Sequence, residues 1–117
     1  MSLAEELARW ATSFEPSAED LALADRSLAD TAAVALASRA EPIHRALDGL
    51  GARGGLGEAG RWAVAAHVLD FDDLHMPTTT HVSAVCVPAA LATGTGARGY
   101  LAGAGVMVRL GARLGWQ

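Results

Sequence analysis

Alanine is the feature that most constrains the fold of this chain, because 26 of its 117 residues are alanine. Alanine is the best helix former among the amino acids, but its side chain buries little apolar area. Aromatic side chains are scarce, with two Phe, three Trp and one Tyr. No segment has the strict alternation of apolar and polar residues that is typical of a strand. The sequence therefore predicts an all-α fold with a thin hydrophobic core.

Apolar residues recur with a helical period in six segments, which we expect to form about six helices in one helical unit over residues 1–117. Ser17 stands three residues before Asp20, a variant of the capping box that begins a helix. Pro42 suits the first turn of a helix, where its missing N–H costs nothing. The expected helices span about residues 2–14, 17–38, 41–50, 58–73, 83–91 and 97–117.

Six glycines fall within residues 49–60, and we interpret this segment as a loop. It follows no predicted strand and lacks the Gly-Lys-Ser/Thr ending of a phosphate-binding loop. After the last predicted helix the chain stops at Trp116 and Gln117, with no polar tail. We therefore expect this chain to be the first part of a larger helical domain, whose uncovered apolar faces lead to self-association.

Charge and cysteine content exclude several classes of function. The formal net charge is −4, with nine arginines and no lysine, and no basic patch with interleaved aromatic residues points to nucleic acid. The single cysteine, Cys86, has apolar neighbours and is expected to be a buried structural thiol. No signal peptide and no membrane-spanning segment is predicted, so we expect a cytoplasmic protein without a nucleic-acid or membrane partner.

The segment from His67 to His81 carries most of the chemistry, with three histidines and three aspartates in fifteen residues. A helix that continues through this segment would place His67, Asp70 and Asp73 in one row at i+3 spacing. Asp72 would then point about 100° away from that row. A carboxylate beside an imidazole raises its pKa and fixes its tautomer, as a general acid or base requires.

A chain reversal at Met76 and Pro77 would bring the hydroxyls of residues 78–80 and the imidazole of His81 back beside the helix end. This segment therefore predicts a cup of carboxylates, imidazoles and hydroxyls. Two other interpretations remain open. In the first, the three aspartates are only solvated surface residues, because negative charge at the C-terminal end of a helix interacts unfavourably with the helix dipole. A divalent metal is the other, but the His67-x-x-Asp70-x-x-Asp73 spacing matches no recognised ligand pattern, so we predict no metal ligands.

The chain resembles the N-terminal part of the MmgE/PrpD family, which includes 2-methylcitrate dehydratase, cis-aconitate decarboxylase and iminodisuccinate epimerase. The most specific block is Asp70-Phe71-Asp72-Asp73, followed by His81 and Ser83. Further similarity lies in residues 7–11, 28–37, 81–92 and 106–111. The resemblance implies a large helical domain that this chain would begin, dimeric assembly, and action on small di- or tricarboxylates without a metal or organic cofactor.

The resemblance also implies roles for individual residues. Asp70 matches the first aspartate of the family motif and His81 the histidine of its His-Pro-Ser motif, so both are expected to be catalytic. Leu74 stands where family members often have threonine, and Val82 stands where they have proline. The cup adds substrate-binding candidates, and the hydroxyl that family members have at position 74 is either missing here or supplied by residues 78–80. These candidates are Asp73, His75, Thr79 and Thr80.

The expected function is therefore the N-terminal portion of a lyase that removes a proton next to a carboxylate and then expels water or CO2. Return of the proton to the other face, as in an epimerase, is a further outcome. Cationic groups must stabilise the developing enolate. Because the chain has no lysine, we expect it to be inactive alone. The alternative is a non-catalytic helical protein that survives as an oligomer.

Overall fold

The computed structural model describes residues 1–49 and 55–115, and 78% of these residues are helical. Within this part of the chain there is no extended strand, only an isolated antiparallel bridge between His75 and Thr80. The prediction of an all-α fold with six helices is confirmed. The elements are α1 (Leu3–Ser13), α2 (Ala18–Ala37), η1 (Ser38–Ala40), α3 (Ile43–Gly49), α4 (Gly55–His67), η2 (Met76–Thr78), α5 (Ser83–Ala92) and α6 (Gly96–Leu114).

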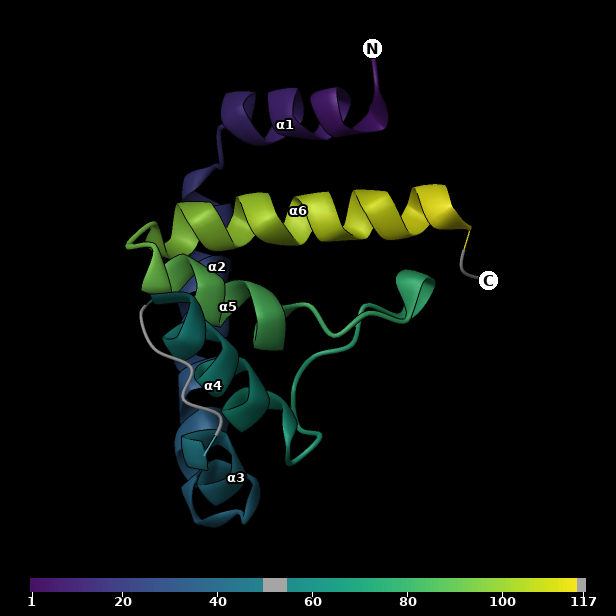
Figure 1. Cartoon of the computed structure of the whole chain (residues 1–117). Helices are drawn as coiled ribbons and strands as arrows, with labels where there is room; N and C mark the ends of the chain where they lie inside the picture. Colours follow the sequence, from purple (N-terminus) through teal and green to yellow (C-terminus); the bar gives the residue numbers. More distant parts are fainter. Residues whose placement is uncertain (50–54, 116–117) are drawn as a thin grey trace.

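The long helix α2 organises the bundle, because it packs against α4, α5 and α6 (Figure 1). α4 packs on α5, and α5 packs on α6, so these three helices form a continuous layer over α2. α1 lies along α6, and α3 contacts α4 at the far end of the molecule (Figure 1). The segment that connects α4 to α5 extends away from the bundle toward the end of α6, and η2 contacts α6.

Two capping boxes fix the starts of the first two helices. At α2, the amide of Asp20 donates to Ser17 Oγ at 3.1 Å, and the amide of Ser17 donates to the Asp20 carboxylate at 2.8 Å. This pair was predicted from the sequence. The same arrangement links Ser2 and Glu5 at the start of α1. The serine hydrogen bonds to each carboxylate hold the pKa values of Glu5 and Asp20 below their usual range.

The predicted extent of the fourth helix, residues 58–73, is wrong at both ends. α4 begins at Gly55, so the glycine-rich loop predicted over residues 49–60 contributes its last six residues to a helix, while residues 50–54 lie outside the described part. Contacts with α2 and α5 compensate for the weak helix propensity of these glycines. α4 ends at His67, because continuing it would place three aspartates against the negative end of its dipole.

The core is built largely from small side chains, as the composition predicts. One buried cluster joins Ala24 of α2 to Cys86 and Val87 of α5 and to Tyr100 of α6. Burial raises the pKa of the Cys86 thiol and the charge of Asp73 adds to this effect, so the thiol stays protonated. A second cluster contains only alanines from α2, α4 and α5: Ala35, Ala65, Ala66 and Ala84.

Several larger apolar residues that follow the helical period of the sequence, and would be expected on buried helix faces, are exposed instead. Leu36 and Ile43 are 55% and 37% exposed, and Phe71 is 74% exposed because it follows the end of α4. Leu50 and Trp116 lie outside the described residues. Among the helices that the structure describes, none has both the length and the apolar content needed to cross a membrane.

The contact between α1 and α6 depends on a glycine. The indole of Trp10 stacks on Phe14 with ring centroids 5.0 Å apart, and the guanidinium of Arg109 lies 3.7 Å from the Trp10 ring centroid. On the α6 side, a Cβ at Gly105 would lie only 2.0 Å from the indole. Gly105 therefore lets the two helices approach, and the indole has little room to move between its two neighbours.

We predict opposite effects for alanine at two helical glycines. Gly105→Ala lowers the free energy of unfolding by roughly 1 kcal/mol, because an overpacking cost of about 1–3 kcal/mol outweighs the gain in helix propensity. Gly60→Ala is the matched control, since a Cβ there meets no atom within 4 Å. It should raise the stability by roughly 0.5–1 kcal/mol. Urea unfolding of both variants measures the difference, and a stabilised Gly105→Ala variant would contradict this account of the α1–α6 contact.

Candidate functional site

The candidate site forms where the connection between α4 and α5 folds back on itself (Figure 1). The chain turns just after α4 at Asp70, which has a left-handed φ of 55°. It then closes a short loop in which the amide of His75 donates to the Thr80 carbonyl at 2.9 Å. This return brings His81 beside His67 at the end of α4, with ring centroids 4.8 Å apart. The reversal predicted at Met76 and Pro77 is confirmed.

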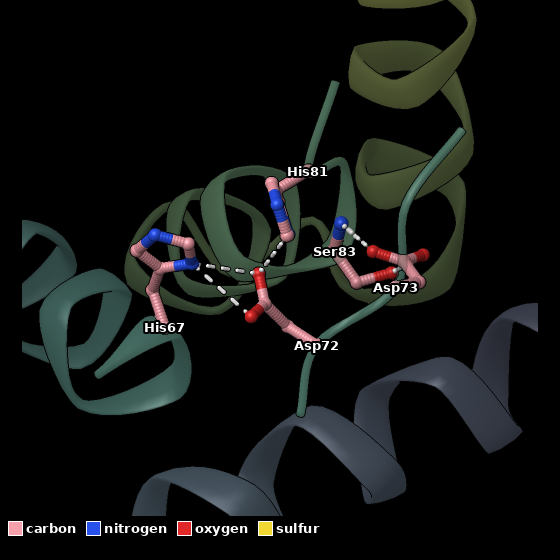
Figure 2. Close-up of polar contacts among 5 residues, drawn as sticks. All are labelled: His67, Asp72, Asp73, His81 and Ser83. Carbon is pink, nitrogen blue, oxygen red and sulfur yellow. Dashed lines mark hydrogen bonds and ion pairs between the residues drawn. The ribbon is translucent and has the colours of Figure 1, made fainter. Parts of the chain in front are cut away.

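The carboxylate of Asp72 lies between the two imidazoles (Figure 2). Nδ1 of His81 is 2.9 Å from Asp72 Oδ2, and Nδ1 of His67 is 3.1 Å from each of the two Asp72 oxygens. Only 2% of the Asp72 side chain is exposed, compared with 55% for His67 and 33% for His81. A buried carboxylate is thus held by two partly exposed histidines.

These contacts fix the histidine tautomers when Asp72 is ionised. An ionised carboxylate only accepts hydrogen bonds, so both Nδ1 atoms must carry a proton and donate it. When His81 is neutral, its Nε2 atom is therefore the unprotonated nitrogen. A histidine oriented in this way by a carboxylate can take a proton at Nε2, and the carboxylate stabilises the cation that results.

The neighbouring Asp73 has a different partner and a structural task. Its carboxylate accepts a hydrogen bond from the amide of Ser83 at 2.8 Å and another from the Ser83 hydroxyl (Figure 2). Because that hydroxyl donates to Asp73, the Tyr100 hydroxyl, 3.0 Å away, donates to Ser83 Oγ. Asp73 therefore caps the first turn of α5 from the connection that precedes this helix, and through Ser83 it is linked to α6.

The threonine run stabilises the loop before His81. The side chain of His75 contacts Thr78 Oγ1 at 2.8 Å, and the hydroxyls of Thr79 and Thr80 both donate to the carbonyl of Thr78. Thr78 is buried against Gly111 of α6, where a Cβ would lie 2.9 Å from the threonine side chain. The loop is thus fixed both internally and against α6.

Two cavities adjoin His81. The larger, about 400 Å³, lies between the threonine run and the end of α6. It is lined by Thr78, Thr79, Thr80, His81, Met107, Leu110, Gly111 and Leu114. The smaller, about 300 Å³, is lined by Ala63, Val64, His67, His81, Ala84 and Val85. Of His67, Asp72 and His81, only His81 therefore lines both cavities.

The structure gathers the predicted site residues only in part. His81, Thr79 and Thr80 line one cavity, whereas Asp73 is engaged with α5 and His75 with Thr78. The predicted row of His67, Asp70 and Asp73 along one helix is wrong, because α4 ends at His67. Asp70 is exposed, yet one of its oxygens lies within 4.8 Å of donor atoms of His67, Asp72 and His81.

Sequence reasoning missed Asp72 as a site residue. Its assignment to the far side of a helix followed from extending α4 through residue 73. The signal that would have corrected this was the run of three aspartates at the end of the expected helix, where the dipole disfavours negative charge. With the helix ended at His67, the middle aspartate is free to turn back toward both histidines.

No protein-family model matches this chain, and comparison with curated proteins and with solved structures finds no match.

We predict that Asp73→Asn lowers the free energy of unfolding by about 1–2 kcal/mol, because it removes a charged acceptor from the start of α5. Asp70→Asn, the same chemical change three residues earlier, should alter stability by less than about 0.5 kcal/mol. Asparagine tolerates the left-handed conformation of Asp70, so the comparison isolates the cap. Denaturant unfolding provides the measurement, and equal midpoints for the two variants would rule out the capping role.

Proposed function

We propose that the chain supplies the acid–base part of a lyase site that removes a proton next to a carboxylate, after which water or CO2 is lost. The observation that carries this proposal is the position of His81: its Nδ1 atom faces the buried Asp72 carboxylate, and its ring borders the 400 Å³ cavity. The resemblance of Asp70-Phe71-Asp72-Asp73 and His81 to the MmgE/PrpD motifs supports the same chemistry. A cytoplasmic location is part of this proposal.

In the proposed reaction, Nε2 of His81 takes a proton from the carbon next to a substrate carboxylate. When water is lost, the electron pair of the C–H bond forms a double bond as the hydroxyl group leaves, and the proton on Nε2 is passed to that oxygen to give water. When CO2 is lost, the electron pair of the broken C–C bond stays on the substrate, and the proton on Nε2 is returned to the substrate carbon. Asp72 stabilises the imidazolium that forms, and His67 shares the Asp72 carboxylate. Asp70 stands at the edge of this group, where the resemblance places a catalytic aspartate.

The cavity suits a small acid in size but not in charge. Its volume of about 400 Å³ is within the range of small-molecule sites. The described residues that line it include no arginine, and the hydroxyls of Thr79 and Thr80 already donate to Thr78. Four arginines are engaged elsewhere: Arg61 with Asp48, Arg98 with Glu15, Arg109 with Trp10 and Arg113 with Glu6.

The size of the cavity and its shortage of cations together lead to a two-part prediction for the 117-residue chain. Titration with cis-aconitate or 2-methylcitrate should shift the NMR signals of the His81 ring and of the Thr79 and Thr80 amides in a saturable way. No product should form, because the stabilisation of the developing enolate, often worth about 3–4 kcal/mol per group, is missing. The absorbance of the unsaturated acid measures product formation.

His44 is the internal control for the titration, since its contact with Ser38 lies outside the cluster. The His81→Ala variant is the control for the threonine amides, which should no longer shift. A His44 signal that moves as much as that of His81 would argue against a site at the cavity. Turnover above the His81→Ala background would contradict the argument that the reaction needs cationic groups to stabilise the developing enolate.

A second candidate function is a non-catalytic role in assembly, with a second copy of this chain as the partner. It is favoured by an apolar groove of about 270 Å³ between α2, α4 and α5. Trp62 and Leu91 line this groove and are 43% and 54% exposed, and the pocket also includes Pro88. The radius of gyration, 14.8 Å, exceeds the roughly 13.4 Å expected for a compact chain of this length, because the molecule is elongated, with extents of 43 × 30 × 28 Å.

We therefore predict a homodimer. Exposed apolar patches of this kind mark interfaces, and a stable dimer buries about 1,200–2,000 Å² in total. Analytical ultracentrifugation at micromolar concentration should give twice the 12.0 kDa mass of the chain. Leu91→Glu should shift the equilibrium to monomer by placing a charge in the groove. A folded wild-type monomer under these conditions would exclude the dimer.

A further inference from the structure

His67, Asp70, Asp72 and His81 bring together two imidazoles and two carboxylates from the end of α4 and the connection to α5. One donor atom from each residue lies within 4.8 Å of the donor atoms of the other three. We propose that these four residues bind one divalent transition-metal ion, with Zn²⁺ as its representative. Such a site goes beyond the proposed lyase chemistry and does not rest on it.

The inner donors lie slightly closer together than the ligands of one ion, so a small outward shift would admit it. Zn²⁺ binds imidazole nitrogen and carboxylate oxygen at about 2.0–2.2 Å, so donors around a tetrahedral ion lie about 3.3–3.6 Å apart. Nδ1 of His67 and Nδ1 of His81 lie 3.1 and 2.9 Å from Asp72 oxygens. Asp70 is the outer donor, and its exposed position on an irregular segment allows it to approach the ion.

The charge of the cluster favours a cation. The Asp72 side chain is 2% exposed, and its ion-pair partners in the described part of the chain are only the two histidines. A buried carboxylate is costly unless positive charge compensates it. Neutral histidines provide hydrogen bonds but no net charge. A divalent ion balances both aspartates while the imidazoles remain neutral.

The donor set also selects the kind of ion. Two imidazole nitrogens with two carboxylate oxygens suit Zn²⁺, Co²⁺ or Ni²⁺, whereas Mg²⁺ and Ca²⁺ prefer sites made only of oxygen. The spacing of His67 and His81 matches no local zinc motif, because the two residues belong to different elements that meet only after the chain reverses. The exposed ring of His67, at 55%, provides access to the ion.

Metal binding and base catalysis exclude each other at His81. An ion on Nδ1 needs the lone pair of that nitrogen, so the single proton of the neutral ring, which Nδ1 otherwise donates to Asp72, moves to Nε2. That nitrogen then has no lone pair with which to take a proton from a substrate. The metal-loaded cluster is therefore a second state of the same residues, and metal binding can be measured with no carboxylic acid present.

Calorimetric titration of the chelator-treated 117-residue chain with Zn²⁺ tests the proposal. We expect one ion per chain and a melting temperature that rises with Zn²⁺ concentration, because only the folded chain assembles the site. His67→Gln should lower the affinity for Zn²⁺ at least about 10-fold. Loss of a residue that only orients a metal ligand already has an effect of this size, and His67 is a ligand itself. Asp72→Asn should lower it further, since it removes the central ligand.

Two variants serve as matched controls: His44→Gln, outside the cluster, and Asp30→Asn, exposed on α2. Both should keep the wild-type affinity. Because the His67 ring is largely exposed, His67→Gln stays informative even where Asp72→Asn fails to fold. Absence of Zn²⁺ binding, unchanged affinity in His67→Gln, or an equal loss in His44→Gln would each overturn the site. None of these results bears on binding of carboxylic acids, which the NMR titration measures separately.

Discussion

The hydrogen bonds from Ser83 to the Asp73 carboxylate hold the candidate site against the bundle. They complete the first turn of α5, and through Ser83 Oγ they reach Tyr100 of α6. Since Asp72 precedes Asp73 directly, fixing one carboxylate also fixes where the other can point. The position of Asp72 between His67 and His81 therefore depends on a cap that lies outside the site itself.

The helices were predictable because local signals and tertiary packing agree over most of the chain. The capping box at Ser17 and Asp20 and the 3.6-residue period located α2 correctly. The packing of the helices was harder to predict, because alanine occurs on both the buried and the exposed face of a helix and therefore does not identify the buried one. Leu36 fits the apolar face of its helix and yet is exposed, while the buried contacts of α4 are made by Ala65 and Ala66.

The candidate site was predictable in its members but not in its geometry. The density of histidine and aspartate identified the segment, and the turn near Pro77 correctly returned His81 to the end of α4. The contact of His81 with Asp72 depends on where α4 ends. The spacing of apolar residues does not locate a helix end exactly, because charges near the end also decide whether the last turn forms. Because α4 ends at His67, Asp72 contacts both histidines, whereas Asp73 caps α5.

The docking of α1 on α6 has a consequence for how the chain folds during synthesis. Glu15 pairs with Arg98, which lies 83 residues later, and α6 is the main partner of α1. At a translation rate of about 5–20 residues per second, those residues take roughly 4–17 s to be made. Throughout that interval Trp10 and Phe14 have no α6 to pack against. The apolar face of α1 is consequently open to water or to chaperones until α6 has been made.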